Sequence, residues 1–144
     1  MKTKLIFSLL LLGFYLISCK KDSKSSDNDI TKQKLLGKWN NTTSTFISNN
    51  FVDNSVHDTT TVSNQNGEYY DFRSDGSVAI NDFTGLDTIP YVVLNDTSIS
   101  IGPDAFYVSR DYTIKILSGT TLELYAKTFG SQHMVYETTL DFSK

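Results

Sequence analysis

The feature that most constrains the fold is a period-two alternation of apolar and polar residues, which recurs along the chain with turn residues between the runs. Alternation of this kind is typical of β-strands that bury one face, and helical periodicity is nearly absent after residue 18. The clearest hairpin is centred on Ser74-Asp75-Gly76, because Asp-Gly tolerates positive φ. The sequence predicts about nine strands, at residues 36–48, 51–62, 68–73, 77–83, 89–94, 97–101, 106–117, 122–128 and 134–142.

The alternation also predicts which face of each strand is buried. Short connections in chain order favour an up-and-down barrel, which leaves no sheet edge exposed. We therefore expect an all-β fold, a single antiparallel up-and-down barrel of about eight or nine strands. The apolar residues expected on one face are Tyr70, Phe72, Val78, Ile80, Ile89, Tyr91, Val93, Tyr112, Ile114, Ile116, Leu122, Leu124, Met134, Tyr136, Leu140 and Phe142.

A short motif opens the first predicted strand. Gly37-Lys38-Trp39 resembles the Gly-x-Trp motif of lipocalins, in which the tryptophan plugs the closed end of an eight-stranded barrel. Together with residues 70–78 and 112–124, it resembles the small lipocalin-like domains of bacterial lipoproteins, and the resemblance covers residues 35–142. It implies a barrel, plugged by Trp39 and Gly37, that binds a small, partly apolar molecule.

The chain departs from the lipocalin pattern around this tryptophan. No basic residue is clearly placed to stack on the Trp39 ring. Arg73 and Arg110, the only arginines, are the candidates by elimination. The chain also has a single cysteine, so it has no internal disulfide.

That cysteine, Cys19, follows a short apolar segment. Lys2 and Lys4 give a basic start, and residues 5–17 are mostly apolar but fewer than the ~20 that a membrane-spanning helix needs. With the small residue Ser18 before Cys19, the segment resembles the signal peptides of bacterial lipoproteins. The resemblance implies cleavage after residue 18 and acyl chains such as palmitate on Cys19.

The residue after the cysteine bears on which membrane would hold the protein. Lys20 stands where the inner-membrane retention signal of many bacterial lipoproteins has aspartate. We therefore expect an exported outer-membrane lipoprotein, held by its lipid at Cys19 on the periplasmic or the cell-surface side.

The composition of the remaining chain predicts its organisation. Residues 19–34 are rich in Lys, Ser, Asp and Asn, and are expected to form a flexible tether. Residues 35–144 are long enough for one domain with one core. Without Lys2 and Lys4 the chain keeps 11 basic and 16 acidic residues, a formal net charge of −5. This charge makes a nucleic-acid partner unfavourable.

Residues able to carry catalysis or bind metal are scarce. His57 and His133 are the only histidines, and they lie far apart in the sequence. A metal site needs three or four convergent ligands, and no Gly-x-Ser-x-Gly turn is present. We expect no metal, no cofactor and no enzymatic activity.

Two interpretations of the barrel interior are open. In residues 40–66, 18 of the 27 are Ser, Thr, Asn or Gln, so this segment cannot fill a core by itself. One interpretation is a ligand pocket, and the other is that the aromatic rings simply fill the core. A different function is also open, in which the polar N-terminal strands dock a partner protein or a glycan of the cell envelope. The candidate ligand-lining residues are Asn41, Thr43 and Thr45 with Tyr70, Phe72, Tyr91, Tyr112 and Tyr136.

Overall fold

The computed structural model describes residues 27–50, 52–53, 55–64, 67–103, 109–130 and 133–144. Residues 1–26, which include the expected signal peptide and Cys19, lie outside this part of the chain. Within the described ranges one helix precedes nine strands: α2 (Asp27–Leu35), β1 (Gly37–Asn50), β2 (Val56–Ser63), β3 (Tyr69–Phe72), β4 (Ser77–Asp82), β5 (Gly85–Asn95), β6 (Ser98–Ile101), β7 (Arg110–Leu117), β8 (Thr121–Phe129) and β9 (Met134–Ser143).

The strands form one antiparallel sheet that closes into a barrel. Its order is β2-β1-β3-β4-β5-β6-β7-β8-β9, and β1 also pairs with β9. Eight strands therefore form the closed barrel, and β2 is an additional strand outside the ring. The predicted all-β barrel with short sequential connections is confirmed.

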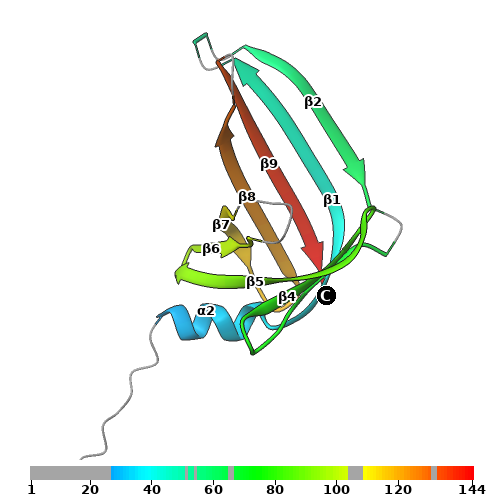
Figure 1. The fold of residues 1–144 in the computed structure, drawn as a ribbon, viewed down its shortest axis with the longest axis vertical. Coiled ribbons are helices and arrows are strands. Elements are labelled where there is room, and N and C mark those ends of the chain that lie inside the picture. Colours follow the sequence, from blue (N-terminus) through cyan, green and yellow to red (C-terminus); the bar gives the residue numbers. More distant parts are fainter. Residues whose placement is uncertain (1–26, 51, 54, 65–66, 104–108, 131–132) are drawn as a thin grey trace, which may run out of the picture.

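The additional strand arises because β1 changes its neighbour along its length. The first part of β1, from Gly37 to Asn40, pairs with β3, whereas Thr43 to Asn49 pairs with β2. Beyond this change β1, β2, β8 and β9 continue as a long curved sheet above strands β3 to β7 (Figure 1). We call this upper part, residues 43–50, 56–63, 125–129 and 134–139, the wing.

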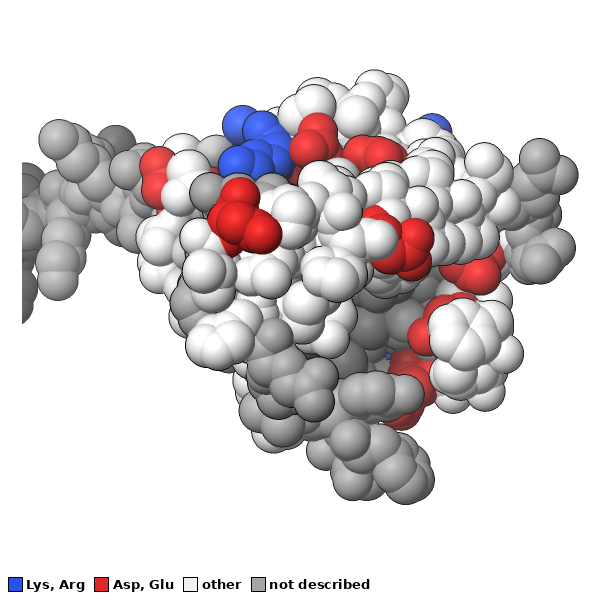
Figure 2. All heavy atoms as spheres, turned by 90° about the horizontal axis from the view of Figure 1, so that it is seen from above, with Lys and Arg blue, Asp and Glu red and all other residues white. Residues whose placement is uncertain are grey.

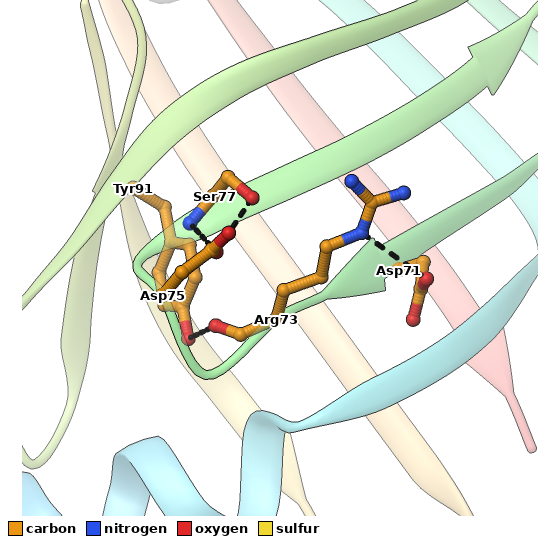
Figure 3. Close-up of polar contacts among 5 residues, drawn as sticks. All are labelled: Asp71, Arg73, Asp75, Ser77 and Tyr91. Carbon is orange, nitrogen blue, oxygen red and sulfur yellow. Dashed lines mark hydrogen bonds and ion pairs between the residues drawn. The ribbon is translucent and has the colours of Figure 1, made fainter.

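The hairpins are built on a repeated side-chain turn. In the β3–β4 hairpin, Oδ1 of Asp75 accepts hydrogen bonds from the backbone N and the hydroxyl of Ser77, at 2.9 and 2.7 Å (Figure 3). Gly76 has a φ of 87°, which glycine adopts without steric cost. The same arrangement joins Asp82 to Thr84 and Asn95 to Thr97. Asp and Asn favour turns through such bonds to the residue two positions on.

One end of the barrel is closed by a packed core. Trp39, Leu122 and Leu124 are fully buried there, and the Phe72 ring packs edge-on against Tyr91, with ring centroids 5.0 Å apart. The Trp39 indole N–H donates to the carbonyl of Leu35 at 2.6 Å. The Trp39 side chain, near the start of β1, therefore links the core to the C-terminal end of α2.

A lysine occupies the position on the tryptophan ring for which the sequence suggested an arginine. Nζ of Lys144 lies 4.1 Å from the Trp39 ring centre and donates to the carbonyl of Leu36 at 2.9 Å. Arg73 instead pairs with Asp71, 3.6 Å away in the β3–β4 hairpin (Figure 3). The elimination was wrong because pairing of β9 with β1 brings Lys144 back to the start of the barrel.

The prediction of a flexible tether up to residue 34 is also wrong, since residues 27–35 form α2. The helix packs against β5, and Figure 1 shows it beneath β4 and β5. Thr31 and Leu35, four residues apart on one helical face, are both buried. Thr31 also donates to the carbonyl of Asp96 at 3.3 Å. These tertiary contacts stabilise a helix whose sequence alone is typical of a polar linker.

Most of the residues predicted on the apolar face belong to the core, but three do not: Met134, which is half-buried, Ile116 and Tyr136. Ile116 is 45% exposed, because a β-bulge between Ile114 and Ile116 interrupts the alternation. Tyr136 is 46% exposed, because it lies on the wing and not in the closed part of the barrel.

Candidate functional site

The barrel contains a cavity at the end opposite the Trp39 core. Its volume is about 820 Å³, within the range of roughly 300–1,000 Å³ that small-molecule sites usually have. The walls come from β3 to β8, and the mouth lies beside the β4–β5 hairpin. Its lining residues are Tyr70, Ile80, Asp82, Phe83, Thr84, Gly85, Asp87, Ile89, Ile101, Gly102, Ser109, Arg110, Asp111, Tyr112, Lys127 and Thr128.

Strand register explains how these residues meet. Tyr70 of β3 pairs with Ile80 of β4, and Ile80 in turn pairs with Asp87 of β5. On the other side, Ile101 of β6 pairs with Arg110 of β7. Directly paired residues have side chains on the same face of the sheet. The interior therefore has an apolar floor of isoleucines with polar groups above it.

Two tyrosines stand inside this cavity. Burial is the main cause that raises the pKa of the Tyr70 phenol, and the charge of Asp82 raises it further. Burial also raises the pKa of the Tyr112 phenol, while the charge of Arg110 and its hydrogen bond lower it. Both phenols are therefore neutral at physiological pH. Each offers a hydroxyl and a ring face to a molecule in the cavity.

The charged residues differ in the face on which they lie. Each inward-facing charge stands two residues from a side chain in or against the core, and so shares its face: Asp82 from Ile80, Asp87 from Ile89 and Arg110 from Tyr112. Lys127 belongs to the outer face, where its Nζ lies 3.2 Å from Glu137. Seen from above in Figure 2, acidic side chains are spread over much of the surface, whereas basic side chains gather mainly in one patch. Of the charged residues that face the cavity, Asp82 and Asp87 are acidic and Arg110 is basic.

The structure divides the aromatic residues proposed from the sequence between two places. Tyr70 and Tyr112 line the cavity. Phe72 and Tyr91 are 1% and 4% exposed and fill the closed end instead. The hydroxyl of Tyr91 donates to the carbonyl of Arg73 at 3.1 Å, which ties it to the β3–β4 hairpin (Figure 3). The aromatic residues therefore fill the core at one end of the barrel and line a cavity at the other.

The polar candidates of the first strand do not line the cavity. Asn41 is buried, and its side-chain amide donates to the hydroxyl of Ser44 at 3.0 Å. A β-bulge between Asn41 and Thr43 moves Ser44 to the inner face, so Thr43 and Thr45 lie on the outer face. The prediction that these two threonines face the interior is wrong for this reason.

The remaining aromatic candidate, Tyr136, lies on the inner face of the wing, away from the cavity lining. The sequence analysis missed Asp82, Asp87 and Arg110 as lining residues. Alternation was a signal for the first two, because each stands two residues from an isoleucine predicted to face inward. The same signal marked Arg110, which stands two residues before Tyr112, another residue predicted to face inward.

No family model, curated protein or solved structure matches this chain. Within the described ranges, no group of three or more His, Cys, Asp or Glu residues could hold a metal ion. The same part of the chain contains no helix long and apolar enough to cross a membrane.

Proposed function

We propose that this protein is a non-enzymatic lipocalin-like lipoprotein that binds a small, partly apolar molecule inside its barrel. The observation that supports this function best is the cavity of about 820 Å³, open at one end and lined by isoleucines and two tyrosines. An apolar pocket with a few placed polar groups is typical of small-molecule sites. The buried Trp39 at the other end agrees with the lipocalin-like plug.

The proposal includes an anchor to the outer membrane through acyl chains on Cys19. Asp27, the first residue of α2, is eight residues after Cys19, so the chain between them spans at most about 28 Å. α2 packs at the closed end of the barrel. This arrangement would hold the closed end near the membrane and leave the cavity mouth accessible to a ligand.

Filling the cavity is expected to abolish binding. Ile80→Trp adds a large ring to the cavity floor, and should weaken binding of the neutral probe N-phenyl-naphthylamine by at least about tenfold, equivalent to about 1.4 kcal/mol. Isothermal titration calorimetry on the purified protein measures the effect. Ile116→Trp is the matched control, because Ile116 is 45% exposed and outside the cavity.

Circular dichroism would establish that both variants keep the β-fold. Equal probe affinity for Ile80→Trp and the parent protein would contradict binding inside the barrel. Absence of probe binding to the parent protein would count against this site for neutral apolar molecules of that size.

A second function is supported by one feature of the wing. Every residue of β2 is exposed, and no other described strand pairs with its outer edge. An unpaired edge is a template for another chain. We propose as the alternative that the polar strands β1 and β2 dock a partner protein or a surface glycan of the cell envelope.

Alanine substitution of Thr59, Thr60 and Thr61 tests this alternative, since all three side chains are exposed on β2. Photo-crosslinking from Val62 in intact cells should yield an adduct that these substitutions weaken severalfold. Substitution of Thr120, an exposed residue at the opposite end of the barrel, is the control. An adduct that is unchanged by the triple substitution would exclude docking through these side chains.

A further inference from the structure

The charges inside the cavity are divided between two walls. Asp82 and Asp87 belong to the β4–β5 hairpin, whereas Arg110 belongs to β7. Asp82 pairs with Gly85 in the hairpin, and Ile80 pairs with Asp87. The two aspartates are therefore diagonal neighbours on the inner face, with Cβ atoms about 7 Å apart. A single small cationic group could contact both carboxylates.

Space for such a group exists beside the carboxylates. Gly85 stands opposite Asp82, and a Cβ atom at this glycine would meet nothing within 4 Å. The φ of Gly85 is 124°, a conformation that other residues rarely adopt. The hairpin thus keeps an open position beside Asp82, at the mouth of the cavity.

The carboxylates are oriented by the hairpin. Oδ1 of Asp82 accepts from the backbone N and hydroxyl of Thr84, at 2.7 and 2.6 Å. Oδ1 of Asp87 accepts from the backbone N of Thr88 at 2.7 Å. Within the described chain these bonds use one oxygen of each carboxylate. The other oxygen of each remains available to a ligand.

Arg110 forms no ion pair with either aspartate. Among the described residues, the ion pairs within 4.0 Å are Arg73–Asp71 and Lys127–Glu137, so Arg110 contacts neither Asp82 nor Asp87. Arg110 and Tyr112 lie two residues apart on β7, so both side chains are on the inner face of that strand. The hairpin wall therefore carries two negative charges with no cation of the described chain paired to them, and a wall of one sign of charge attracts groups of the opposite sign.

The aromatic rings suit the same ligand. Tyr70 and Tyr112 line the cavity as neutral phenols, and the face of an aromatic ring attracts a cation within about 6 Å. Below them, Ile80, Ile89 and Ile101 offer an apolar surface. The cavity therefore combines an apolar floor, two aromatic rings and a wall with two carboxylates.

We propose that the preferred ligand is a cationic amphiphile, with an apolar body on the isoleucine floor and a protonated amine between Asp82 and Asp87. This inference rests on the proposed function and specifies the charge of the molecule bound. A ligand with an anionic head would face two carboxylates at the hairpin wall, and a neutral one would leave them without a counter-charge.

Three probes with the same alkyl chain test the proposal: decylammonium, decanol and decanoate, each kept below its micelle concentration. Calorimetry on the purified protein at pH 7 is expected to show decylammonium binding about tenfold more tightly than decanol, and decanoate binding most weakly. The preference for decylammonium should decrease at high salt, because screening weakens the charge interaction.

The double variant Asp82→Asn/Asp87→Asn is expected to lose the tenfold preference for decylammonium and to keep its affinity for decanol. The fold tolerates asparagine in this turn, since Asn95 makes the same bonds to Thr97 at 2.9 and 3.0 Å. Asp75→Asn is the matched control, because Asp75 makes this turn with Ser77 in a different hairpin, outside the cavity lining (Figure 3).

The outcomes separate this inference from the proposed function. Equal affinity for all three probes, tightest binding of decanoate, or an unchanged preference in the double variant would each overturn the cationic ligand while leaving a ligand-binding barrel. Failure of all three probes to bind would overturn both.

Discussion

Trp39→Ala is expected to lower the free energy of unfolding by about 3–5 kcal/mol, the cost typical of removing a large buried aromatic ring. The Trp39 side chain has no exposed surface, and its indole N–H bonds to the carbonyl of Leu35 at 2.6 Å. The substitution removes core contacts, the bond to the end of α2 and the ring beneath Lys144 at once. Urea unfolding followed by circular dichroism measures the loss.

Two further variants make the result specific. Trp39→Phe keeps a buried ring but has no indole N–H, and is expected to cost less than the alanine variant. Phe83→Ala removes an aromatic ring that is 91% exposed, and should change stability by no more than about 0.5 kcal/mol. A Trp39→Ala variant as stable as the Phe83→Ala variant would contradict a plug at the closed end.

The barrel was predictable from the sequence because its strands are short, sequential and separated by turns with a clear chemistry. The β3–β4 hairpin shows why: Asp75 and Gly76 favour the turn locally, and the flanking residues alternate without interruption. Pairing of neighbours in the chain then determines most of the sheet. In this region local preference and the global fold agree, which is the condition for reading structure from sequence.

The elements that were not predicted depend on contacts between distant parts of the chain. α2 has a polar sequence, and is stabilised by contacts of Thr31 and Leu35 with the barrel. Lys144 meets Trp39 only because β9 closes the barrel against β1. The alternation of apolar and polar residues within a strand carries no information about contacts between residues far apart in the sequence.

The site was predictable only in part, for a different reason. A single bulge reverses the face of every residue that follows it in a strand. The bulge after Asn41 therefore misplaced Thr43 and Thr45, and the bulge before Ile116 had the same effect in β7. Tyr70 lies in a strand paired without a bulge, and its inward position could be read from the sequence. Asp82 and Asp87 also lie in strands that pair without a bulge. Their inward position could have been read in the same way, but charged side chains usually lie on the surface.

Cys19→Ala is expected to abolish lipid attachment completely, since this residue is the only cysteine in the chain. Cleavage after Ser18 should be lost as well, because in bacterial lipoproteins the signal peptidase cuts before the lipid-modified cysteine. The precursor would then keep its basic and apolar N-terminal segment. Labelling of cells with a fatty-acid analogue, together with the mass of the purified protein, measures both effects.

The size of the effect follows from the energetics of anchoring. Each buried methylene contributes about 0.8 kcal/mol, and a single acyl chain binds a membrane only reversibly, whereas two chains give stable anchoring. Loss of the one attachment point therefore removes the anchor altogether. Ser18→Ala is the matched control, because it keeps a small residue before Cys19 and should leave labelling and cleavage intact. Fatty-acid labelling that persists in Cys19→Ala would refute the proposed lipid anchor, and with it the proposed position of the cavity relative to the membrane.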